Sequence, residues 1–239
     1  MNIAIIVAGL AALAATPAKA APISMDSSQA KAYFTKASAT AEGLFGGKPS
    51  VAVLLPNAES TSSRLEIWSR FGDGYQRLAL APKAGCSQCS GPSAKPNPVK
   101  MSFVHDSLNV EYQGGGSGLG FWAWRSTWGW DPLLSAARAV ATQRLGSDEN
   151  GFPRHSLVSF ISGERFARKS SPQGISASHC RADIAKPPSF AALSLDAFFD
   201  GALDPRCQSG SELDDALDDG EAGGSLDNLM RPSAPAKSK

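Results

Sequence analysis

Four of the five tryptophans of this chain lie close together and all at even positions, namely Trp122, Trp124, Trp128 and Trp130. Successive side chains of a strand point to opposite faces, so this spacing places the four indoles on one side of an extended segment. On a helix the same positions would scatter around the axis. The stretch 114–132 therefore predicts a strand with one aromatic face.

This aromatic face has two interpretations. Burying each indole removes on the order of 150–250 Å² from water and contributes about 4–6 kcal/mol, which favours a place in the core. The alternative is an exposed ligand platform for a glycan or peptide. For a core face, we expect Trp122 and Trp124 to be the most buried and Trp128 and Trp130 to be half exposed. The residues between them should then meet solvent on the opposite face: Ala123, Arg125 and Thr127.

The first twenty residues have the features of a signal peptide. The apolar run 3–13 is shorter than the roughly 20 residues that a membrane-spanning helix needs. The sequence Ala18-Lys19-Ala20 has the small-x-small pattern of a signal-peptidase site, so we expect the mature chain to begin at Ala21. No later apolar run is long enough to span a membrane. The sequence therefore predicts export, to the periplasm or the medium, without a membrane span.

Charge is balanced overall, with 23 Lys and Arg against 22 Asp and Glu. No clustered basic stripe of the kind that binds a phosphate backbone is present, which argues against nucleic acid as a partner. Beyond Cys207 the chain becomes acidic and Gly/Ser-rich, and then Pro/Lys-rich, a composition typical of disorder. We therefore expect one β-rich exported domain over residues 21–207 and a disordered tail over 208–239.

Alternating patterns and turn signals predict a mainly β fold of the α+β class. The expected strands are a single strand at 51–55 and three hairpins, which pair 64–70 with 75–80, 99–104 with 108–112, and 156–161 with 165–168. Residues 170–189 show no regular pattern. Apolar positions at helical spacing predict an N-terminal helix over 27–44, ended by Gly46-Gly47, and a short C-terminal helix over 194–203.

The segment 131–146 is ambiguous. Asp131 as a cap, Pro132 at the first helical position and Gly146 at the end favour a helix by propensity.

Several segments between residues 64 and 166 follow one another in a recognisable order. They are a hairpin (65–80), a Cys-x-x-Cys before glycine (86–91), a strand ending in a Gly-Gly turn (108–116), an aromatic strand (121–130), a further strand (133–144) and a closing hairpin (158–163). This series resembles a pattern found among exported and envelope bacterial proteins that lack an assigned activity. Ser159 and Ser162 stand where that pattern has Asn and Thr. The resemblance implies an antiparallel β-meander in which 133–144 is a strand, and it implies no catalytic residue and no cofactor.

The four cysteines are Cys86, Cys89, Cys180 and Cys207. In an oxidising compartment they are expected to form disulfides, and three pairings exist. We favour Cys86–Cys89 as a local clip and Cys180–Cys207 as the stabilising bridge, because closing the longer loop contributes roughly 3–4 kcal/mol. Export disfavours a zinc site, and the Ser-Gly-Pro that follows the Cys-x-x-Cys disfavours a thioredoxin-like role, which needs a helix there.

The block His105-Asp106-Ser107-Leu108 resembles the GDSL block of SGNH-type hydrolases. That resemblance would make Ser107 a nucleophile, with His155 or His179 as its base. A histidine replaces the glycine of the block, and no Asp-x-x-His is present to supply the base. A serine without a positioned base is a weak nucleophile, and a polar turn accounts for the same residues.

Our hypothesis from the sequence is therefore a non-enzymatic exported protein. It would act as an envelope binding or interaction module for an envelope protein, a glycan or a peptide, with no cofactor or metal. The alternative is a secreted serine hydrolase that uses Ser107.

Overall fold

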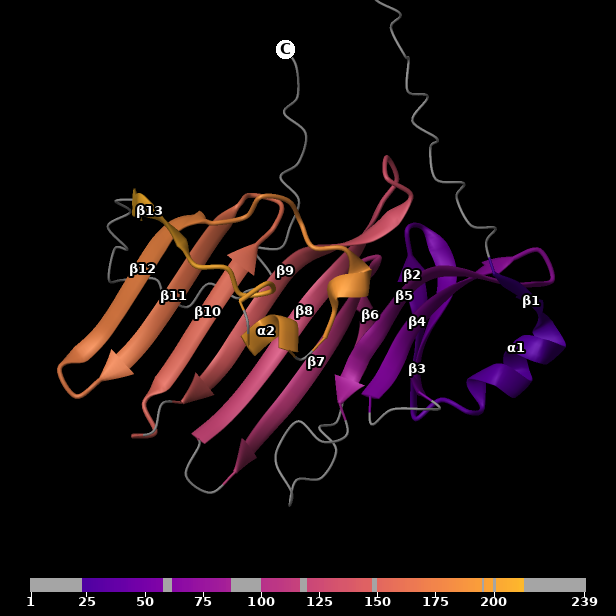
Figure 1. Ribbon diagram of the computed structural model, residues 1–239, viewed down its shortest axis with the longest axis horizontal. Coiled ribbons are helices and arrows are strands. Elements are labelled where there is room, and N and C mark those ends of the chain that lie inside the picture. Colours follow the sequence, from indigo (N-terminus) through magenta and orange to yellow (C-terminus); the bar gives the residue numbers. More distant parts are fainter. Residues whose placement is uncertain are drawn as a thin grey trace, which may run out of the picture.

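The computed structural model describes residues 23–57, 62–86, 100–116, 120–147, 150–194, 196–199 and 201–212. It is built from two antiparallel sheets that lie side by side along the long axis of the molecule (Figure 1). Three predicted features lie wholly or partly outside the described residues. They are the signal peptide, the Cys86–Cys89 disulfide (because Cys89 is not described) and most of the C-terminal tail.

The first sheet has five strands in the order β1-β5-β4-β3-β2. Their bounds are β1 Ser24–Asp26, β2 Ala39–Phe45, β3 Lys48–Pro56, β4 Ser62–Phe71 and β5 Gly74–Cys86. The predicted strand at 51–55 and the hairpin around Gly72-Asp73-Gly74 are confirmed as parts of β3, β4 and β5.

The second sheet is an eight-stranded meander in which every strand pairs with its neighbour in sequence. Its strands are β6 Lys100–Val104, β7 Ser107–Gly116, β8 Gly120–Asp131, β9 Ala136–Ser147, β10 Pro153–Ser159, β11 Glu164–Ser171, β12 Gly174–Ala182 and β13 Cys207–Glu212. The mainly β class is thus confirmed, and so is the antiparallel meander that the resemblance implied.

The N-terminal helix is much shorter than its pattern suggested. Helix α1 spans Ser27–Phe34, with Asp26 as its cap, and the prediction of a helix over 27–44 is wrong beyond that point. Residues 39–45 form β2 instead, because Gly46 and Gly47 both take positive φ angles (61° and 73°) and turn the chain back into a hairpin with β3. Turns of this kind match the twist of paired strands. The hydrogen bonds that residues 39–45 make with β3 outweigh the weak helical propensity of that segment.

The ambiguous segment after the tryptophans is a strand, as the resemblance implied. Pro132–Ser135 form a turn, in which the Asp131 carboxylate accepts hydrogen bonds from the backbone N–H groups of Leu133 and Leu134. The capping signal was therefore real, but it closes a turn and not a helix. Strand β9 follows and is paired on both sides, by β8 and β10.

Two stretches expected to be irregular are strands. Residues 170–189 contain β12, whose sequence GISASHCRA carries little apolar alternation because most of its side chains are exposed. Residues 207–212 form β13, so the predicted disorder from 208 is wrong as far as Glu212. In the predicted helix 194–203, a single turn is present as α2 (Asp196–Phe199), preceded by a 3-10 turn, η1 (Phe190–Ala192).

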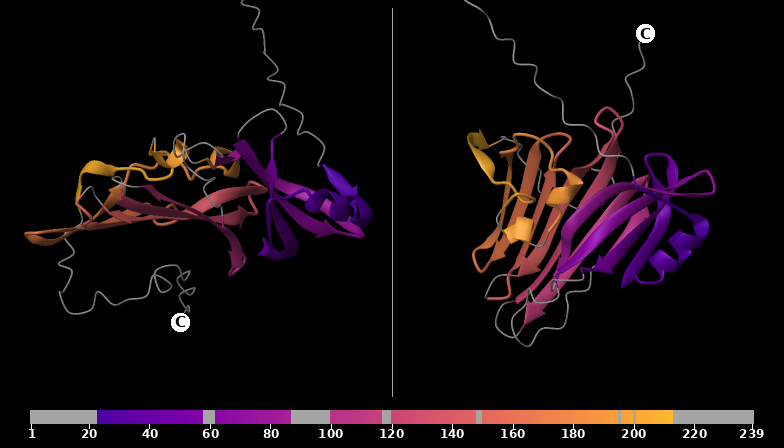
Figure 2. Two further views of the ribbon diagram at one scale, coloured as in Figure 1. Left: turned by 90° about the horizontal axis from the view of Figure 1, so that it is seen from below. Right: turned by 45° about the vertical axis from the view of Figure 1, so that its right-hand side comes forward.

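The described residues between 183 and 206 form the crossing layer, a separate layer that crosses one face of the second sheet (Figure 2). We call the covered side the inner face and the opposite side the outer face. Phe198 stacks on Trp124 with ring centroids 4.7 Å apart, and Phe190 meets Trp128 edge-on at 5.1 Å. Buried side chains of the first sheet, including Leu54, join the same core.

The two sheets meet along β2 and β6 without a shared ladder. Gly43 permits this approach, because a Cβ added there would lie 2.3 Å from the Cβ of Phe103. The Tyr112 hydroxyl of β7 donates a hydrogen bond to the carbonyl of Ala84 on β5, which ties the second sheet to the first.

The predicted disulfide between Cys180 and Cys207 is present, with Cα atoms 5.7 Å apart. It fixes the end of the crossing layer to β12. Closing a loop with a sequence separation of 27 contributes about 3.5 kcal/mol in the chain-entropy model. A disulfide of this kind indicates folding in an oxidising environment.

Helix α1 covers the far side of the first sheet, where Glu66 is almost completely buried. Its carboxylate accepts from Trp68 Nε1 (2.8 Å) and from the Tyr33 hydroxyl (3.0 Å). It also pairs with Arg64 (3.0 Å) and Arg77 (3.4 Å). One carboxylate therefore joins α1 to β4 and β5.

Removing the charge of Glu66 should destabilise the fold strongly. We expect Glu66→Gln to lower the free energy of unfolding by about 3 kcal/mol, because it leaves two partly buried guanidinium groups without their counter-ion. Urea denaturation measures this. The same change at exposed Glu42 on β2 should cost less than about 0.5 kcal/mol, and equal stabilities of the two variants would contradict the assignment.

Candidate functional site

All four clustered tryptophans lie on the inner face of β8, as their spacing predicts. Trp124 and Trp128 are 1% and 0% exposed, whereas Trp122 and Trp130 are only partly buried. The expectation that Trp122 would be among the most buried and Trp128 half exposed is wrong. The crossing layer explains the burial of Trp128, because Phe190 covers its ring.

On the outer face of β8, Arg125 is exposed as expected and pairs with Glu111 at 3.1 Å. Thr127 and Ala123 are buried, which the sequence did not predict. Thr127 donates a hydrogen bond to the side chain of Asn109 (2.7 Å) on the neighbouring strand. Its polar group is therefore satisfied within the sheet.

The strand register keeps Ser107 away from both candidate bases. Ser107 begins β7, next to His105 and Asp106, which form the positive-φ turn between β6 and β7. His155 lies three strands from β7 and is aligned across the sheet with Gln113 of that strand. His179 lies five strands from β7 and is aligned with Glu111. With strands about 4.8 Å apart and a rise of about 3.3 Å per residue, each separation is on the order of 20 Å or more. Ser107 and these histidines therefore do not form a catalytic pair.

Within the described ranges, no group of three His, Cys, Asp or Glu side chains is placed to hold a metal ion. No helix of the described residues combines the length and apolar character that crossing a bilayer requires.

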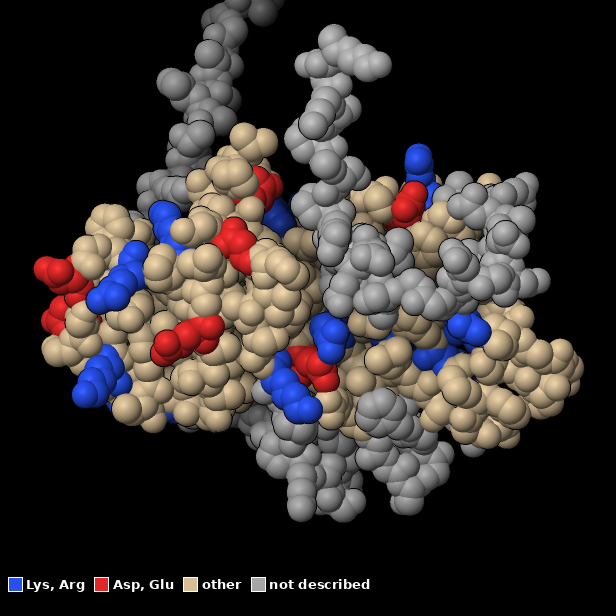
Figure 3. Space-filling view, turned by 180° about the vertical axis from the view of Figure 1, so that it is seen from behind, with Lys and Arg blue, Asp and Glu red and all other residues tan. Residues whose placement is uncertain are grey.

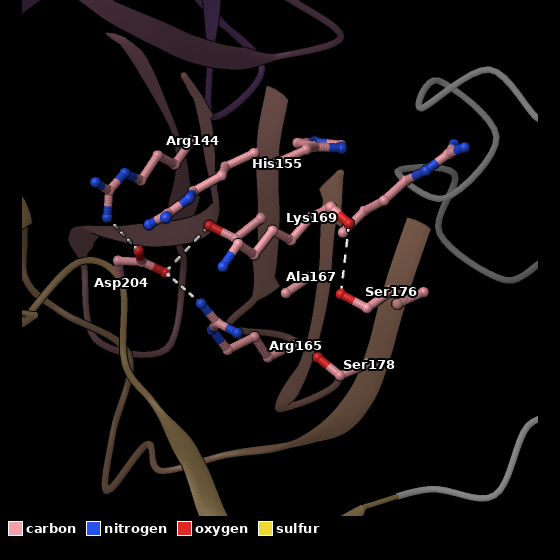
Figure 4. A pocket seen from close by; sticks show the side chains of 12 residues that line it. Arg144, His155, Arg165, Ala167, Lys169, Ser176, Ser178 and Asp204 are labelled. Atoms are coloured by element: carbon pink, nitrogen blue, oxygen red, sulfur yellow. Dashed lines mark hydrogen bonds and ion pairs between the residues drawn. The ribbon is translucent and has the colours of Figure 1, made fainter. Parts of the chain in front are cut away.

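A basic pocket lies on the inner face, beside the crossing layer (Figure 4). It has a volume of about 320 Å³. Its lining comes from four neighbouring strands and from one residue of the crossing layer: Arg144 of β9, Arg154 and Ser156 of β10, Arg165 and Lys169 of β11, Ser176 and Ser178 of β12, and Asp204. Arg168 and His155 border it from the same strands. We call this set the basic pocket.

Asp204 is held at the inner end of the basic pocket by three groups. Its carboxylate lies 3.8 Å from Arg144, 3.6 Å from Arg165 and 3.4 Å from the Ser156 hydroxyl. Charge-assisted hydrogen bonds normally measure about 2.7–2.9 Å, so both ion pairs are loose. The Arg165 Nε atom is buried and makes no hydrogen bond within the described structure. Both arginines therefore retain donors that a further acceptor could engage.

Positive charge dominates the basic pocket, where four Lys and Arg side chains of the inner face accompany the carboxylate of Asp204. Two of them, Arg154 and Lys169, are direct cross-strand partners on the same face of β10 and β11. Like charges placed directly opposite each other destabilise a sheet. By contrast, the back of the molecule mixes basic and acidic side chains across its visible surface (Figure 3).

The tryptophan strand supplies an apolar edge to this region. The Arg144 guanidinium lies over the Trp124 ring at 5.5 Å, and Trp122 contacts Trp124 at 5.3 Å. In the cross-strand row, Gly146 separates Trp122 from Arg154 and has no side chain to fill the space between them. The inner face thus passes from an aromatic surface to a cationic one.

Sequence reasoning missed the basic pocket. Its signal is a set of polar residues at alternating positions, with Arg154 and Ser156 on one strand and Arg165 and Lys169 on the next. Those residues converge only when the register of β10, β11 and β12 is known, and β12 was not expected to be a strand.

Searches against protein-family models, curated proteins and solved structures found no match to this chain. The interpretation of the basic pocket therefore depends on its own chemistry.

His155 lies between Arg154 and Ser156 on β10, in the outer-face row of Leu145 and Arg168. Burial, and then the charge of Arg168, lower the pKa of His155. The Gln143 amide nitrogen lies 3.2 Å from Nε2 of the ring. Because an amide nitrogen only donates, Nε2 must accept, which requires a neutral ring.

Trp128 should matter more to stability than Trp130. We expect Trp128→Ala to cost about 3–5 kcal/mol, as Trp124→Ala should, because each removes a fully buried indole. Trp130→Ala should cost at most about half of that, since its ring is partly exposed. Chemical denaturation of the three variants tests this order, and similar losses for Trp128→Ala and Trp130→Ala would contradict it.

His155 should make the fold less stable as the pH falls. Its pKa is lower in the folded state than in the unfolded chain, whose value is about 6.5, so the unfolded state takes up a proton first. Stability contributed by neutral His155 is therefore complete above about pH 6.5 and declines below it. His155→Gln should lose less unfolding free energy between about pH 7.5 and 5 than the wild type. His105→Asn, in the exposed turn, should keep the wild-type slope; a wild-type slope in His155→Gln would refute the assignment.

Proposed function

We propose that this chain is an exported binding module that holds an anionic ligand in the basic pocket. The observation that carries the proposal is the direct opposition of Arg154 and Lys169 across β10 and β11. The two cations face each other on the same side of the sheet, so an anion placed between them would interact favourably with both side chains.

The other groups of the basic pocket suit oxyanions. Guanidinium groups bind carboxylate and phosphate in a bidentate manner, and the loose pairs of Arg144 and Arg165 with Asp204 leave donors for that purpose. The hydroxyls of Ser176 and Ser178 add neutral donors on β12. Asp204 fixes the directions of the two arginines and reduces the charge that an incoming anion must balance.

The size of the basic pocket and its aromatic border indicate an acidic saccharide, one that carries a carboxylate or a phosphate. A volume of about 320 Å³ lies at the lower end of the range for small-molecule sites and exceeds what one inorganic ion needs. The partly exposed Trp122 offers a flat apolar surface beside the cations, of the kind on which a sugar ring packs. Export to the periplasm or the medium would bring such ligands within reach.

Binding should be lost when either opposed cation is neutralised. Titration calorimetry would compare a galacturonic-acid trisaccharide, glucose 6-phosphate and a neutral trisaccharide. We expect Arg154→Gln and Lys169→Gln each to weaken binding of the acidic ligands about tenfold, the loss of one charged hydrogen bond.

The matched control is Arg125→Gln on the outer face, which removes the same charge outside the basic pocket. It should leave affinity within about twofold of the wild type. Equal losses in Arg125→Gln and Lys169→Gln, or equal affinity for the neutral trisaccharide, would show that the basic pocket does not bind by charge.

A further inference from the structure

The hairpin of β8 and β9 extends beyond both of its neighbours at one end of the second sheet. Its last pair, at Asp131, lies two rows beyond Gly129, and Gly129 is level with Ser107 at the start of β7. On the other side, β10 already ends at Ser159, opposite Ala141. The hairpin therefore projects from the body of the molecule, as both ribbon views show (Figure 1, Figure 2).

The tip of this hairpin, the turn Pro132–Ser135, presents two leucines to solvent. The side chain of Leu133 is 94% exposed and that of Leu134 is 56% exposed. The tip and the first residues of β9, at positions 132–137, read Pro-Leu-Leu-Ser-Ala-Ala and carry no charge. Apolar side chains that are exposed together mark a surface that contacts a partner or a membrane.

The backbone of the tip can leave water at little cost. Pro132 has no N–H group. The N–H groups of Leu133 and Leu134 donate to the Asp131 carboxylate at 3.0 Å and 3.2 Å. An unpaired N–H group would oppose transfer into an apolar phase. The first three residues of the turn therefore bring apolar side chains without an unpaired backbone donor, and the nearest charge, that of Asp131, is already hydrogen-bonded.

The shape of the tip is set by its own residues. The ring of Pro132 restricts its φ angle. Ser135 has a φ angle of 48° and turns the chain into β9. A loop that is already held in one conformation loses little entropy when it docks. The two leucines are thus presented in a fixed position before any contact is made.

The size of the tip favours a lipid bilayer over a protein partner. A stable protein interface takes about 800 Å² from each partner, far more than two leucine side chains offer. A bilayer requires no complementary shape, and apolar groups sink about 5–10 Å into its interfacial region. Arg138, the first charged residue of β9, lies two rows behind the last pair, so about 7 Å of uncharged strand precedes it. The uncharged length of the hairpin therefore matches the depth of that region.

The base of the hairpin carries an aromatic residue that suits the membrane–water interface. Trp130 is only partly buried and directly precedes Asp131. Indole rings, which combine an apolar body with one polar N–H group, are enriched where lipid headgroups meet water. Leucines at the tip and a tryptophan behind them follow the order of an apolar and then an interfacial layer.

We propose that the hairpin of β8 and β9 docks the protein on a lipid bilayer by inserting Leu133 and Leu134 into the boundary between headgroups and acyl chains. Two leucines give a reversible attachment, since even a single acyl chain binds a membrane only marginally. The basic pocket begins at Arg144, further along β9 than Arg138. Docking therefore does not depend on the proposed function.

The first test is flotation with phosphatidylcholine vesicles. The protein is purified after export, so that the apolar run 3–13 of the predicted signal peptide does not contribute. We expect the wild type to float with the vesicles. Leu133→Ser with Leu134→Ser should lower the partition coefficient about tenfold or more, because burying one leucine alone accounts for about that factor.

The matched control is Ile175→Ser, which replaces a side chain that is 61% exposed near the other end of the sheet. It should float like the wild type, and both variants should keep the wild-type urea midpoint because the side chains they change are exposed. No flotation of the wild type, or equal losses in both variants, would overturn the inference. Flotation that requires phosphatidylglycerol and disappears at high salt would indicate adsorption by charge and would also overturn it.

The second test places a reporter at the tip. In Leu133→Trp, the emission added to that of the wild type should shift to the blue with vesicles and be quenched by phosphatidylcholine brominated in its acyl chains. Ile175→Trp, the reporter at the other end, should show neither effect. Equal quenching of the two reporters would overturn insertion by the tip. A dimer in sedimentation without flotation, abolished by Leu133→Ser with Leu134→Ser, would overturn it in favour of a contact between copies of the chain.

Discussion

The packing of Phe198 on Trp124 is the contact on which most of the second sheet depends. Eight strands in one open layer have two faces to cover, and the tryptophans contribute a large part of the apolar surface on the inner face. The crossing layer 183–206 covers that surface, and the Cys180–Cys207 bridge holds the end of the layer against β12. The remainder of the inner face is therefore free to be polar, and the basic pocket begins where the crossing layer ends.

Much of the fold follows from local patterns. Alternation identifies the hairpins of β4 with β5, β6 with β7 and β10 with β11, and glycine turns support the first and the last of them. The failures arise where local propensity and long-range pairing disagree. Residues 39–45 and 136–146 have acceptable helical patterns, and only their partners on neighbouring strands make them strands.

The candidate site was less accessible from the sequence than the fold. Its cations are spread over β9, β10 and β11, and Asp204 joins them from a segment about sixty residues beyond Arg144. No local spacing connects these residues, so a search for clustered charge finds nothing. The tryptophan strand, in contrast, drew attention as a binding surface, whereas the structure uses Trp124 and Trp128 to hold the crossing layer in place.

Under the proposed function, the position of the disulfide would couple redox state to ligand binding. Asp204 lies three residues before Cys207, so the same bridge that closes the chain also sets the carboxylate between Arg144 and Arg165. A chain whose thiols are still reduced lacks this tether and presents its cations without the group that orients them. The chain would therefore bind its ligand only after the disulfide has formed, in the compartment where that oxidation takes place.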